Sequence, residues 1–208
     1  MTTLLVIAKE PRPGRVKTRL TPPFTPEEAA ALAEAALTDT LRTVAGTPVR
    51  RRVLVLDGTA GPWLPPGFDV VPQCAGGLDE RLAAAFAGCD GPALLIGMDT
   101  PQVTPGLLTV DFDGYDACFG PADDGGFWAL GLAEPDPELL RGVPMSTPAT
   151  GAVQRDRLVA AGLRVRELPR LRDVDTAADA EAVAAVAPYG CFAAELARLA
   201  RLRTAGRR

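Results

Sequence analysis

LLVIAKEPRPGRVKTR, residues 4–19, carries the strongest signal of the fold in this chain. Its first five residues form an uninterrupted apolar run, which is typical of a strand buried on both faces of a parallel sheet. Lys9 and Pro11 end that run, and a loop follows it. Ligands of open α/β sheets bind outside the carboxyl ends of the strands. We therefore expect an α/β protein with a binding loop directly after its first strand.

On the carboxyl side of this stretch, strand patterns alternate with helical ones. Thr25-Pro26-Glu27-Glu28 combines an N-cap, a proline at the first helical position and a capping-box glutamate, which predicts a helix to about Val44. Further helices are predicted over 78–86, 147–161 and from 176 onward with a break at 188–190, and further strands over 53–56, 70–71, 93–97, 115–119, 127–132 and 163–168. This alternation indicates a mostly parallel sheet covered by helices on both faces, a three-layer α/β/α arrangement.

The chain is expected to form one domain over residues 1–208, because neither an internal repeat nor a long linker divides it. Its C-terminal part, from about residue 189, is predicted to be a helix with a basic tail. The basic run Arg198–Arg208 is interpreted as a frayed, solvated tail.

Composition excludes several classes of partner. The net charge of −4 gives no reason to expect nucleic acid, and no window reaches the roughly 18 apolar residues of a membrane span. The N-terminus does not resemble a signal peptide, and the four cysteines form no CxxC pair. We therefore expect a cytoplasmic protein that binds neither membrane nor nucleic acid.

The chain contains no histidine. That absence removes Ser-His-Asp and Cys-His triads, imidazole bases and most zinc chemistry. Catalysis must then use carboxylates, lysine, arginine, hydroxyl groups, backbone amides or a metal held by oxygen atoms.

The loop 9–19 carries five cationic side chains in eleven residues. Two prolines stiffen it, and Gly14 lets the backbone approach a ligand closely. A solvated surface loop is the alternative, but the position favours polyphosphate binding. The loop is not a Walker A motif, because Val16 stands where a glycine is needed, and the chain has no GxGxxG motif.

Two acidic segments are candidates for Mg²⁺ or Mn²⁺ binding. Asp99 ends a predicted buried strand before Thr100-Pro101, and Asp173-Val174-Asp175-Thr176 places two acids on one side if it is extended. Asp175 or Thr176 could equally cap the last helix.

Two glycine-containing segments complete the candidate site. Asp123-Asp124-Gly125-Gly126-Phe127 is either a tight turn or a place where Asp124 meets substrate and the glycines allow a close approach. Gln73–Arg81, QCAGGLDER, opens a helix whose first amides could meet a base, a sugar or an anion, or could be an ordinary connection.

These motifs together resemble the DUF2064 family, the "rSAM/selenodomain-associated transferase 1" proteins of glycosyltransferase-A (GT-A) fold, and more distantly the 2-phospholactate guanylyltransferases. The matching motifs are Lys9-x-Pro11-x-Pro13-Gly14-x-Val16-Lys17-Thr18-Arg19-Leu20, Gln73…Gly76-Gly77-Leu78-Asp79-Glu80-Arg81-Leu82, Gly97-Met98-Asp99-Thr100-Pro101, Asp124-Gly125-Gly126-Phe127-Trp128 and Asp173-Val174-Asp175-Thr176. The resemblance implies a nucleotide-diphospho-sugar transferase fold with Lys9, Arg15, Lys17 and Arg19 on phosphates and Asp99 and Asp175 on a metal. Met98 and Met145 depart from the family pattern, which commonly has a serine and an aromatic residue there.

We therefore predict three groups of site residues. The nucleotide-binding group is Lys9, Pro11, Gly14, Arg15, Lys17, Thr18, Arg19, Gln73, Gly76, Gly77 and Arg81. The metal ligands are Asp99 and Asp175, and the catalytic residues are Lys17, Arg19 and Asp124.

Three functions fit these residues. The leading hypothesis is nucleotidyl transfer from an NTP to a small phosphorylated or phosphonate acceptor, with release of pyrophosphate. The alternatives are glycosyl transfer from a nucleotide sugar to a small acceptor and nucleotide binding without turnover. The expected partners are a nucleotide and a small molecule, and a homodimer is left open.

Overall fold

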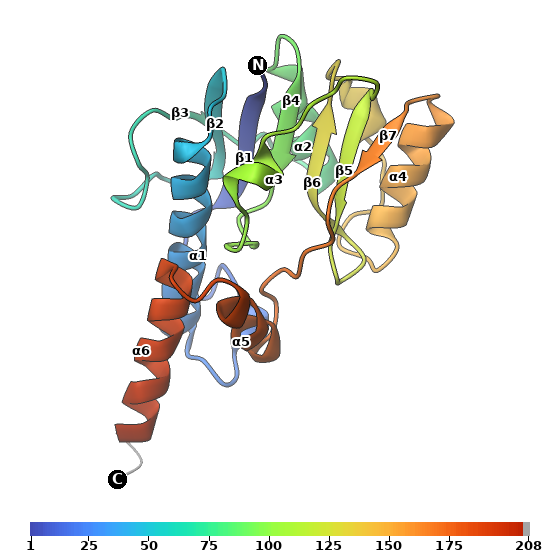
Figure 1. Ribbon diagram of the computed structural model, residues 1–208. Helices are drawn as coiled ribbons and strands as arrows, with labels where there is room; N and C mark the ends of the chain where they lie inside the picture. Colours follow the sequence, from blue (N-terminus) through green and yellow to red (C-terminus); the bar gives the residue numbers. More distant parts are fainter. Residues whose placement is uncertain (206–208) are drawn as a thin grey trace.

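The computed structural model describes residues 1–205, which fold around one seven-stranded sheet (Figure 1). The strand order is β3-β2-β1-β4-β6-β5-β7. The strands are β1 (Thr3–Lys9), β2 (Arg51–Asp57), β3 (Asp69–Pro72), β4 (Ala93–Ile96), β5 (Ala117–Pro121), β6 (Phe127–Leu132) and β7 (Val165–Glu167). Only β6 runs antiparallel to its neighbours in this sheet, so the expectation of a mostly parallel sheet is confirmed.

Helices cover both faces of the sheet, as Figure 1 shows for the front layer with α1 and α3. The helices are α1 (Pro26–Gly46), α2 (Leu78–Ala87), α3 (Pro105–Leu108), α4 (Thr150–Ala160), α5 (Ala177–Val186) and α6 (Cys191–Ala205), with short 3₁₀ turns at Thr18–Leu20 and Pro137–Leu139. Alternation along β1 divides the core: Leu4 and Val6 pack with α1, and Leu5 packs with α2 on the other side. The three-layer prediction is therefore confirmed.

The sequence signals at the start of α1 are seen directly. The Glu28 amide donates to Thr25 Oγ1 at 3.2 Å, and the Thr25 amide donates to Glu28 Oε2 at 2.9 Å. This capping box satisfies two amides that would otherwise lack partners at the helix end. The capping box therefore sets the point at which the connection between β1 and α1 ends.

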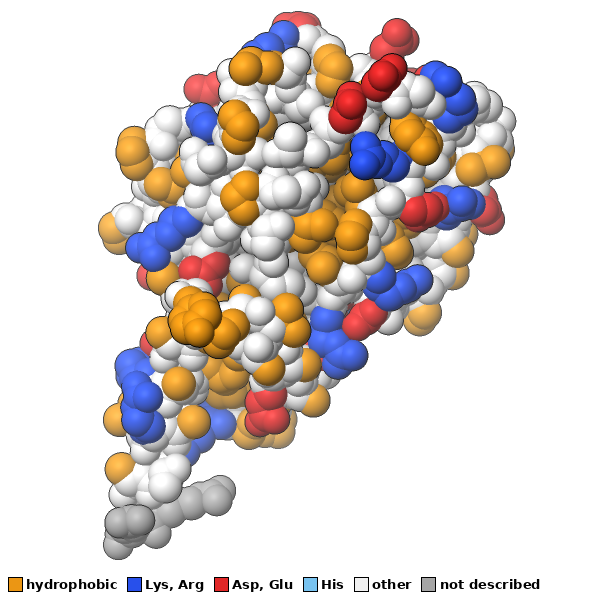
Figure 2. Space-filling view, in the orientation of Figure 1, with side chains coloured by type: hydrophobic (Ala, Val, Ile, Leu, Met, Phe, Trp, Pro, Cys, Tyr) orange, Lys and Arg blue, Asp and Glu red, His pale blue; other side chains and the backbone are white. Residues whose placement is uncertain are grey.

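The C-terminal helix α6 is docked on α1, so the expectation of a frayed tail is wrong as far as Ala205. Asp39 of α1 accepts hydrogen bonds from the amides of Cys191 and Phe192, both at 2.8 Å, and so caps α6 from another helix. Near its other end, Arg203 lies 4.2 Å above the ring of Phe24 and pairs with Glu28 at 2.5 Å. Figure 2 shows α6 extending beyond the body of the protein with basic side chains along it. Residues 206–208, which the same expectation included, lie outside the described part of the chain.

Within residues 1–205, no helix combines the length and the apolar character that crossing a bilayer requires.

Candidate functional site

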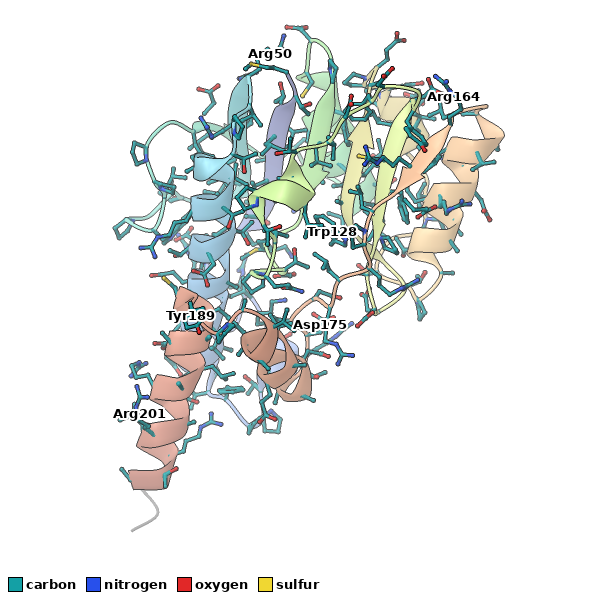
Figure 3. All side chains as sticks on the ribbon, in the orientation of Figure 1. Arg50, Trp128, Arg164, Asp175, Tyr189 and Arg201 are labelled. Carbon is teal, nitrogen blue, oxygen red and sulfur yellow. The ribbon has the colours of Figure 1, made fainter. Side chains whose placement is uncertain are left out.

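Most of the predicted site residues line one cavity of about 770 Å³ at the carboxyl ends of β1 and β4. Figure 3 shows Asp175 between the lower edge of the sheet and α5. The predicted residues that line the cavity are Lys9, Arg15, Lys17, Thr18, Arg19, Gln73, Gly76, Arg81, Asp99, Asp124 and Asp175. Pro11, Gly14 and Gly77 were also predicted, and they are not among its lining residues.

The loop after β1 is held in place by its own apolar residues. Val16 and Leu20 are buried in the core on either side of Lys17. Between them, Lys17 adopts a left-handed backbone conformation with φ 49° and ψ 38°. This conformation costs a residue with a Cβ about 1–2 kcal/mol. The strain is offset by the contacts that the Lys17 side chain makes inside the cavity.

Lys17 joins the two predicted metal ligands. Its Nζ lies 2.9 Å from Asp99 Oδ1 and 3.6 Å from Asp175 Oδ1, and it donates a hydrogen bond to the Val174 carbonyl. The Lys17 side chain is only 7% exposed, so its charge is directed to these acids. Arg19 Nη1 pairs with Asp175 Oδ2 at 3.0 Å.

The resemblance placed four loop cations, Lys9, Arg15, Lys17 and Arg19, on phosphates, but the structure divides these four into two groups. Lys17 and Arg19 are paired with carboxylates. Lys9 and Arg15 line the cavity and form no ion pair among residues 1–205. The unpaired cations are therefore the ones that are ready to meet an anionic ligand.

Backbone contacts bring the distant acidic segments together. The Val174 amide donates to the Asp99 carbonyl at 3.0 Å, which fixes residues 173–175 beside the end of β4. The Asp123 amide donates to the Leu171 carbonyl at 3.0 Å, which fixes the β5–β6 turn beside the same segment. These two bonds place acids from three parts of the chain in one site.

Asp124, Asp173 and Asp175 form the tightest acidic group, with one carboxylate oxygen from each within 4.8 Å of the others. Asp173 was quoted in the sequence motif but was not predicted as a ligand, although the Asp-x-Asp spacing was a signal for it. Burial, followed by the charges of Asp124 and Asp175, raises the pKa of Asp173 to about 6, and Lys17 opposes that shift. Three crowded carboxylates suit a hard divalent cation such as Mg²⁺ or Mn²⁺, so the residues present fit such an ion.

The raised pKa of Asp173 predicts that its carboxylate destabilises the metal-free protein. An unfolded aspartate ionises near 3.8, whereas folded Asp173 ionises at about 6, so the stability falls as the pH rises between these values. Asp173→Asn should therefore raise the unfolding free energy by about 1–2 kcal/mol at pH 7.5 in EDTA, and the difference should vanish toward pH 4. Urea titrations across pH measure this. Asp156→Asn, an exposed change on α4, is the control, and an Asp173→Asn gain that does not depend on pH would contradict the prediction.

Gln73 and Arg81 form a network at the β2–β3 side of the cavity. Gln73 Nε2 donates to the carbonyls of Ala8 at 2.8 Å and Val55 at 3.1 Å, which ties it to β1 and β2. Arg81 Nη1 then donates to Gln73 Oε1 at 3.0 Å and to Asp57 Oδ2 at 3.1 Å. These two residues are rigidly positioned before any ligand arrives.

One amide at the start of α2 already has a partner. Glu80 Oε2 accepts from the Gly77 amide at 2.8 Å, so this amide is satisfied by its own helix. Asp79 Oδ2 accepts from the Gly142 amide at 2.8 Å and links α2 to the segment before α4. The first turn of α2 is therefore hydrogen-bonded to the segment that precedes α4.

The two glycines after Asp124 allow a close approach of protein backbone. Gly125 has φ 89°, and a Cβ there would collide with the Pro148 carbonyl. The Gly151 amide donates to the Gly125 carbonyl at 2.8 Å, and a Cβ on Gly151 would collide with the Gly126 carbonyl. These contacts lock the start of α4 onto the β5–β6 turn, and Asp124 Oδ1 accepts from the Gly126 amide at 2.7 Å in that turn.

Gly151→Ala should therefore destabilise the protein by about 1–3 kcal/mol, because the added methyl group meets backbone that cannot rotate away. Gly46→Ala is the matched control, because Gly46 ends α1 and a Cβ there has no neighbour within 4 Å. The unfolding free energy of this variant should equal that of the unmodified protein or rise slightly. Urea unfolding of both variants measures the difference. Equal stabilities would show that the start of α4 is not locked in this way.

Comparison with known proteins places the chain in a family and a fold. The sequence profile of DUF2064, "uncharacterized protein conserved in bacteria", matches residues 32–147, which is more than half of the chain. No curated protein matches the sequence.

Solved structures with the same fold include a protein from Desulfovibrio desulfuricans G20 that is provisionally described as a nucleotide-diphospho-sugar transferase. It is 25% identical, the match covers 97% of each chain, and the TM-score is 0.86. The 2-C-methyl-D-erythritol 4-phosphate cytidylyltransferase of Thermus thermophilus is 16% identical over 90% of this chain and 100% of its own, with a TM-score of 0.54. Rv0371c of Mycobacterium tuberculosis H37Rv, in complex with manganese, is 24% identical over 88% and 96%, with a TM-score of 0.52.

The profile match includes Gln73–Arg81, Asp99 and Asp124, and the fold match covers 97% of the chain. The chain belongs to the DUF2064 family and has the fold of the nucleotide-diphospho-sugar transferases.

Proposed function

We propose that this protein is a divalent-metal-dependent transferase that moves a nucleotidyl group from an NTP to a small acceptor and releases pyrophosphate. One observation carries the proposal: five cationic and four acidic side chains line a single cavity where β1 and β4 end. The cations are Lys9, Arg15, Lys17, Arg19 and Arg81, and the acids are Asp99, Asp124, Asp173 and Asp175.

The balance of these charges supports a role for a metal. Five positive and four negative side chains leave the cavity nearly neutral, which is a poor match for a polyphosphate. A bound divalent cation makes the cavity clearly positive and relieves the crowding of Asp124, Asp173 and Asp175. Bound there, Mg²⁺ or Mn²⁺ supplies charge that stabilises the phosphoryl oxygens during transfer.

The side chains have separate tasks in this proposal. Lys9 and Arg15, which lack ion-pair partners in the described chain, bind the β- and γ-phosphates. Lys17 holds Asp99 and Asp175 at a fixed separation, and Arg19, whose side chain is 70% exposed, turns from Asp175 toward the leaving pyrophosphate. The acceptor oxygen bonds to the α-phosphorus, and the bond from that phosphorus to the bridging oxygen breaks with its electrons on pyrophosphate. Positioning and electrostatics carry the reaction, which requires no histidine.

The fixed pair Gln73–Arg81 lies on the side of the cavity nearest β2 and β3, where the nucleoside is expected to bind. Proteins that share this fold include a CMP:2-keto-3-deoxy-manno-octonic acid synthetase that was solved with CTP. Nucleotide binding at this edge of the sheet is consistent with the general placement of ligands in open α/β sheets.

A thermal-shift screen of the four NTPs and a set of nucleotide sugars, each with and without Mn²⁺ or Mg²⁺, tests the proposal. A ligand that binds only the folded state raises the melting temperature. We expect an NTP to raise it only when metal is present, and product analysis with that NTP to detect pyrophosphate. A shift that is equal with EDTA, or no shift with any nucleotide, would refute the metal-dependent mechanism.

Glycosyl transfer from a nucleotide sugar is the second candidate. The Desulfovibrio neighbour is provisionally described as a nucleotide-diphospho-sugar transferase, and Asp124 is an exposed carboxylate in the cavity that could accept a proton from an acceptor. The two reactions release different products. Release of a nucleoside diphosphate from a nucleotide sugar, without pyrophosphate from any NTP, would select glycosyl transfer.

A further inference from the structure

The cavity has two ends of different chemistry. All five cations that line it come from the last residue of β1, from the loop after β1 or from α2. The residues contributed by the β5–β6 turn and by the segment before α4 include no lysine or arginine, and Asp124 is their one charged group. In the strand order, β1 and β6 lie on opposite sides of β4, and the two ends meet at the acidic group, where Asp124 lies beside Asp175.

The end near β6 is apolar. Phe127 and Met145 are partly buried against the core cluster that contains Leu82, and all three line the cavity. Leu78 also lines the cavity and is 42% exposed, so its side chain offers apolar surface to a ligand. The ring of Phe127 is fixed by Phe119, with the centroids 5.5 Å apart.

Arg170 and Arg172, which follow β7, bind other groups of the protein instead of facing the cavity. Arg170 donates to the Ala122 carbonyl at 2.8 Å. Arg172 pairs with Asp123 and Asp179 at 3.1 and 3.4 Å. Neither residue lines the cavity, so neither supplies the charge that an acceptor phosphate would need.

Hydroxyl groups and backbone strain mark the same end. Ser146, Thr147 and Thr150 line the cavity beside Met145. Ser146 has φ 59°, and it and Lys17 are the two non-glycine residues with positive φ in the described chain. Thr150 Oγ1 donates to the Pro144 carbonyl at 2.8 Å and accepts from the Thr147 amide at 3.0 Å, which holds this strained turn in place. Strained backbone that is held so firmly is common at ligand sites.

We propose that the acceptor is an uncharged molecule that carries an apolar portion and a hydroxyl group, and that it binds at the Phe127–Met145 end of the cavity. The inference rests on the proposed nucleotidyl transfer and narrows it, because it replaces the phosphorylated or phosphonate acceptor that the sequence suggested. The apolar portion covers Leu78, Phe127 and Met145, and the hydroxyl group points toward Asp124. In the transfer, the acceptor oxygen bonds to the α-phosphorus, its proton passes to solvent water, and pyrophosphate leaves with the electrons of the broken bond.

Three matched probes test the acceptor class: glycerol, glycerol 3-phosphate and 1-O-hexylglycerol, which share a glycerol hydroxyl group. Ligand-observed NMR measures the binding of each probe to the full-length protein, with Mg²⁺ added in place of Mn²⁺ because Mg²⁺ is diamagnetic. Pyrophosphate release measures the reaction of each probe with each NTP. We expect hexylglycerol to bind at least tenfold more tightly than either other probe, because only it covers the apolar residues. Tighter binding of glycerol 3-phosphate, or no binding of any probe, would overturn the proposal.

Charge-introducing variants provide a second measurement. Met145→Lys places a cation at the acceptor end and should move the preference at least tenfold toward glycerol 3-phosphate. Leu78→Lys should act in the same direction and is available if Met145→Lys does not fold, because Leu78 is more exposed. Val159→Lys, on the exposed side of α4, is the matched control and should leave the preference unchanged. An unchanged preference in both cavity variants would place the acceptor elsewhere.

The NMR binding measurement distinguishes failure of the proposed function from failure of the proposed acceptor class. Hexylglycerol binding without any nucleotide-dependent thermal shift would reject the proposed function while supporting the acceptor class. A metal-dependent NTP shift with tighter binding of glycerol 3-phosphate would retain the function and reject the acceptor class.

Discussion

Replacing Asp175 with asparagine is expected to lower the rate of nucleotidyl transfer by about 100- to 1,000-fold. Asp175 belongs to the group of three close carboxylates and also contacts Lys17 and Arg19, so it is the residue that both charge networks share. Asparagine keeps the size of the side chain and removes its charge, so the fold should be retained. Binding of Mn²⁺, followed by electron paramagnetic resonance, should weaken at least tenfold together with the rate.

Asp156→Asn is the matched control for this variant. Asp156 is exposed on α4, forms no ion pair in the described part of the chain, and undergoes the same change of charge. Its activity and Mn²⁺ affinity should equal those of the unmodified protein. Unchanged Mn²⁺ affinity in Asp175→Asn would show that the acidic group does not hold the metal.

Lys17→Met is expected to reduce activity by about 100-fold or more and also to lower the unfolding free energy by about 1–3 kcal/mol. The variant leaves Asp99 and Asp175 without the ammonium group that lies between them, and their mutual repulsion is then uncompensated. Asp99 is 41% exposed, so solvent screens part of this cost. Methionine retains the apolar stem, which separates the loss of charge from the loss of packing. Urea unfolding and pyrophosphate release measure the two effects.

Arg19→Gln is the control for stability, because it also removes a cation from Asp175, but at a side chain that is 70% exposed. Its unfolding free energy should change by less than about 1 kcal/mol. A double-mutant cycle of Lys17→Met with Asp99→Asn isolates the central pair, and the second change should recover part of the lost stability. Additive losses would show that the two side chains do not interact energetically.

The contrast between Lys17 and Arg15 shows where sequence reasoning reached its limit in the candidate site. Both are cations of one loop, and residue type assigns them the same role. In the fold, the burial of Val16 and Leu20 and the left-handed backbone of Lys17 turn its side chain toward Asp99, whereas Arg15 has no acidic partner among residues 1–205. Local sequence carries no information on the direction of the Lys17 side chain, because its partners are distant along the chain. Asp99, which pairs with Lys17, lies 82 positions away, and Val174, whose carbonyl accepts from Lys17, lies 157 positions away.

Gly125 and Gly126 illustrate the same limit. The sequence allowed either a turn or a close approach to substrate, and the structure shows Gly125 packed against the backbone of Pro148. The C-terminal helix α6 shows this limit as well. Its basic residues suggested a solvated tail, whereas the contacts of Asp39 and Glu28 with α6 show that the helix packs on α1. Each of these outcomes depends on a partner distant in sequence.

Features that arise within a few residues could be predicted from the amino-acid order: the buried run of β1, the capping box of α1, the alternation of strands and helices, and the presence of cations and acids at strand ends. Periodicity and capping are short-range, so a local pattern is enough to indicate them. Folding was needed to establish which charges pair, which remain available for a ligand, that Asp173 joins Asp124 and Asp175, and that one end of the cavity is apolar. The physical reason is that electrostatic and packing energies depend on distance in space, and only the folded chain brings the ends of β1, β4 and β6 to a common edge.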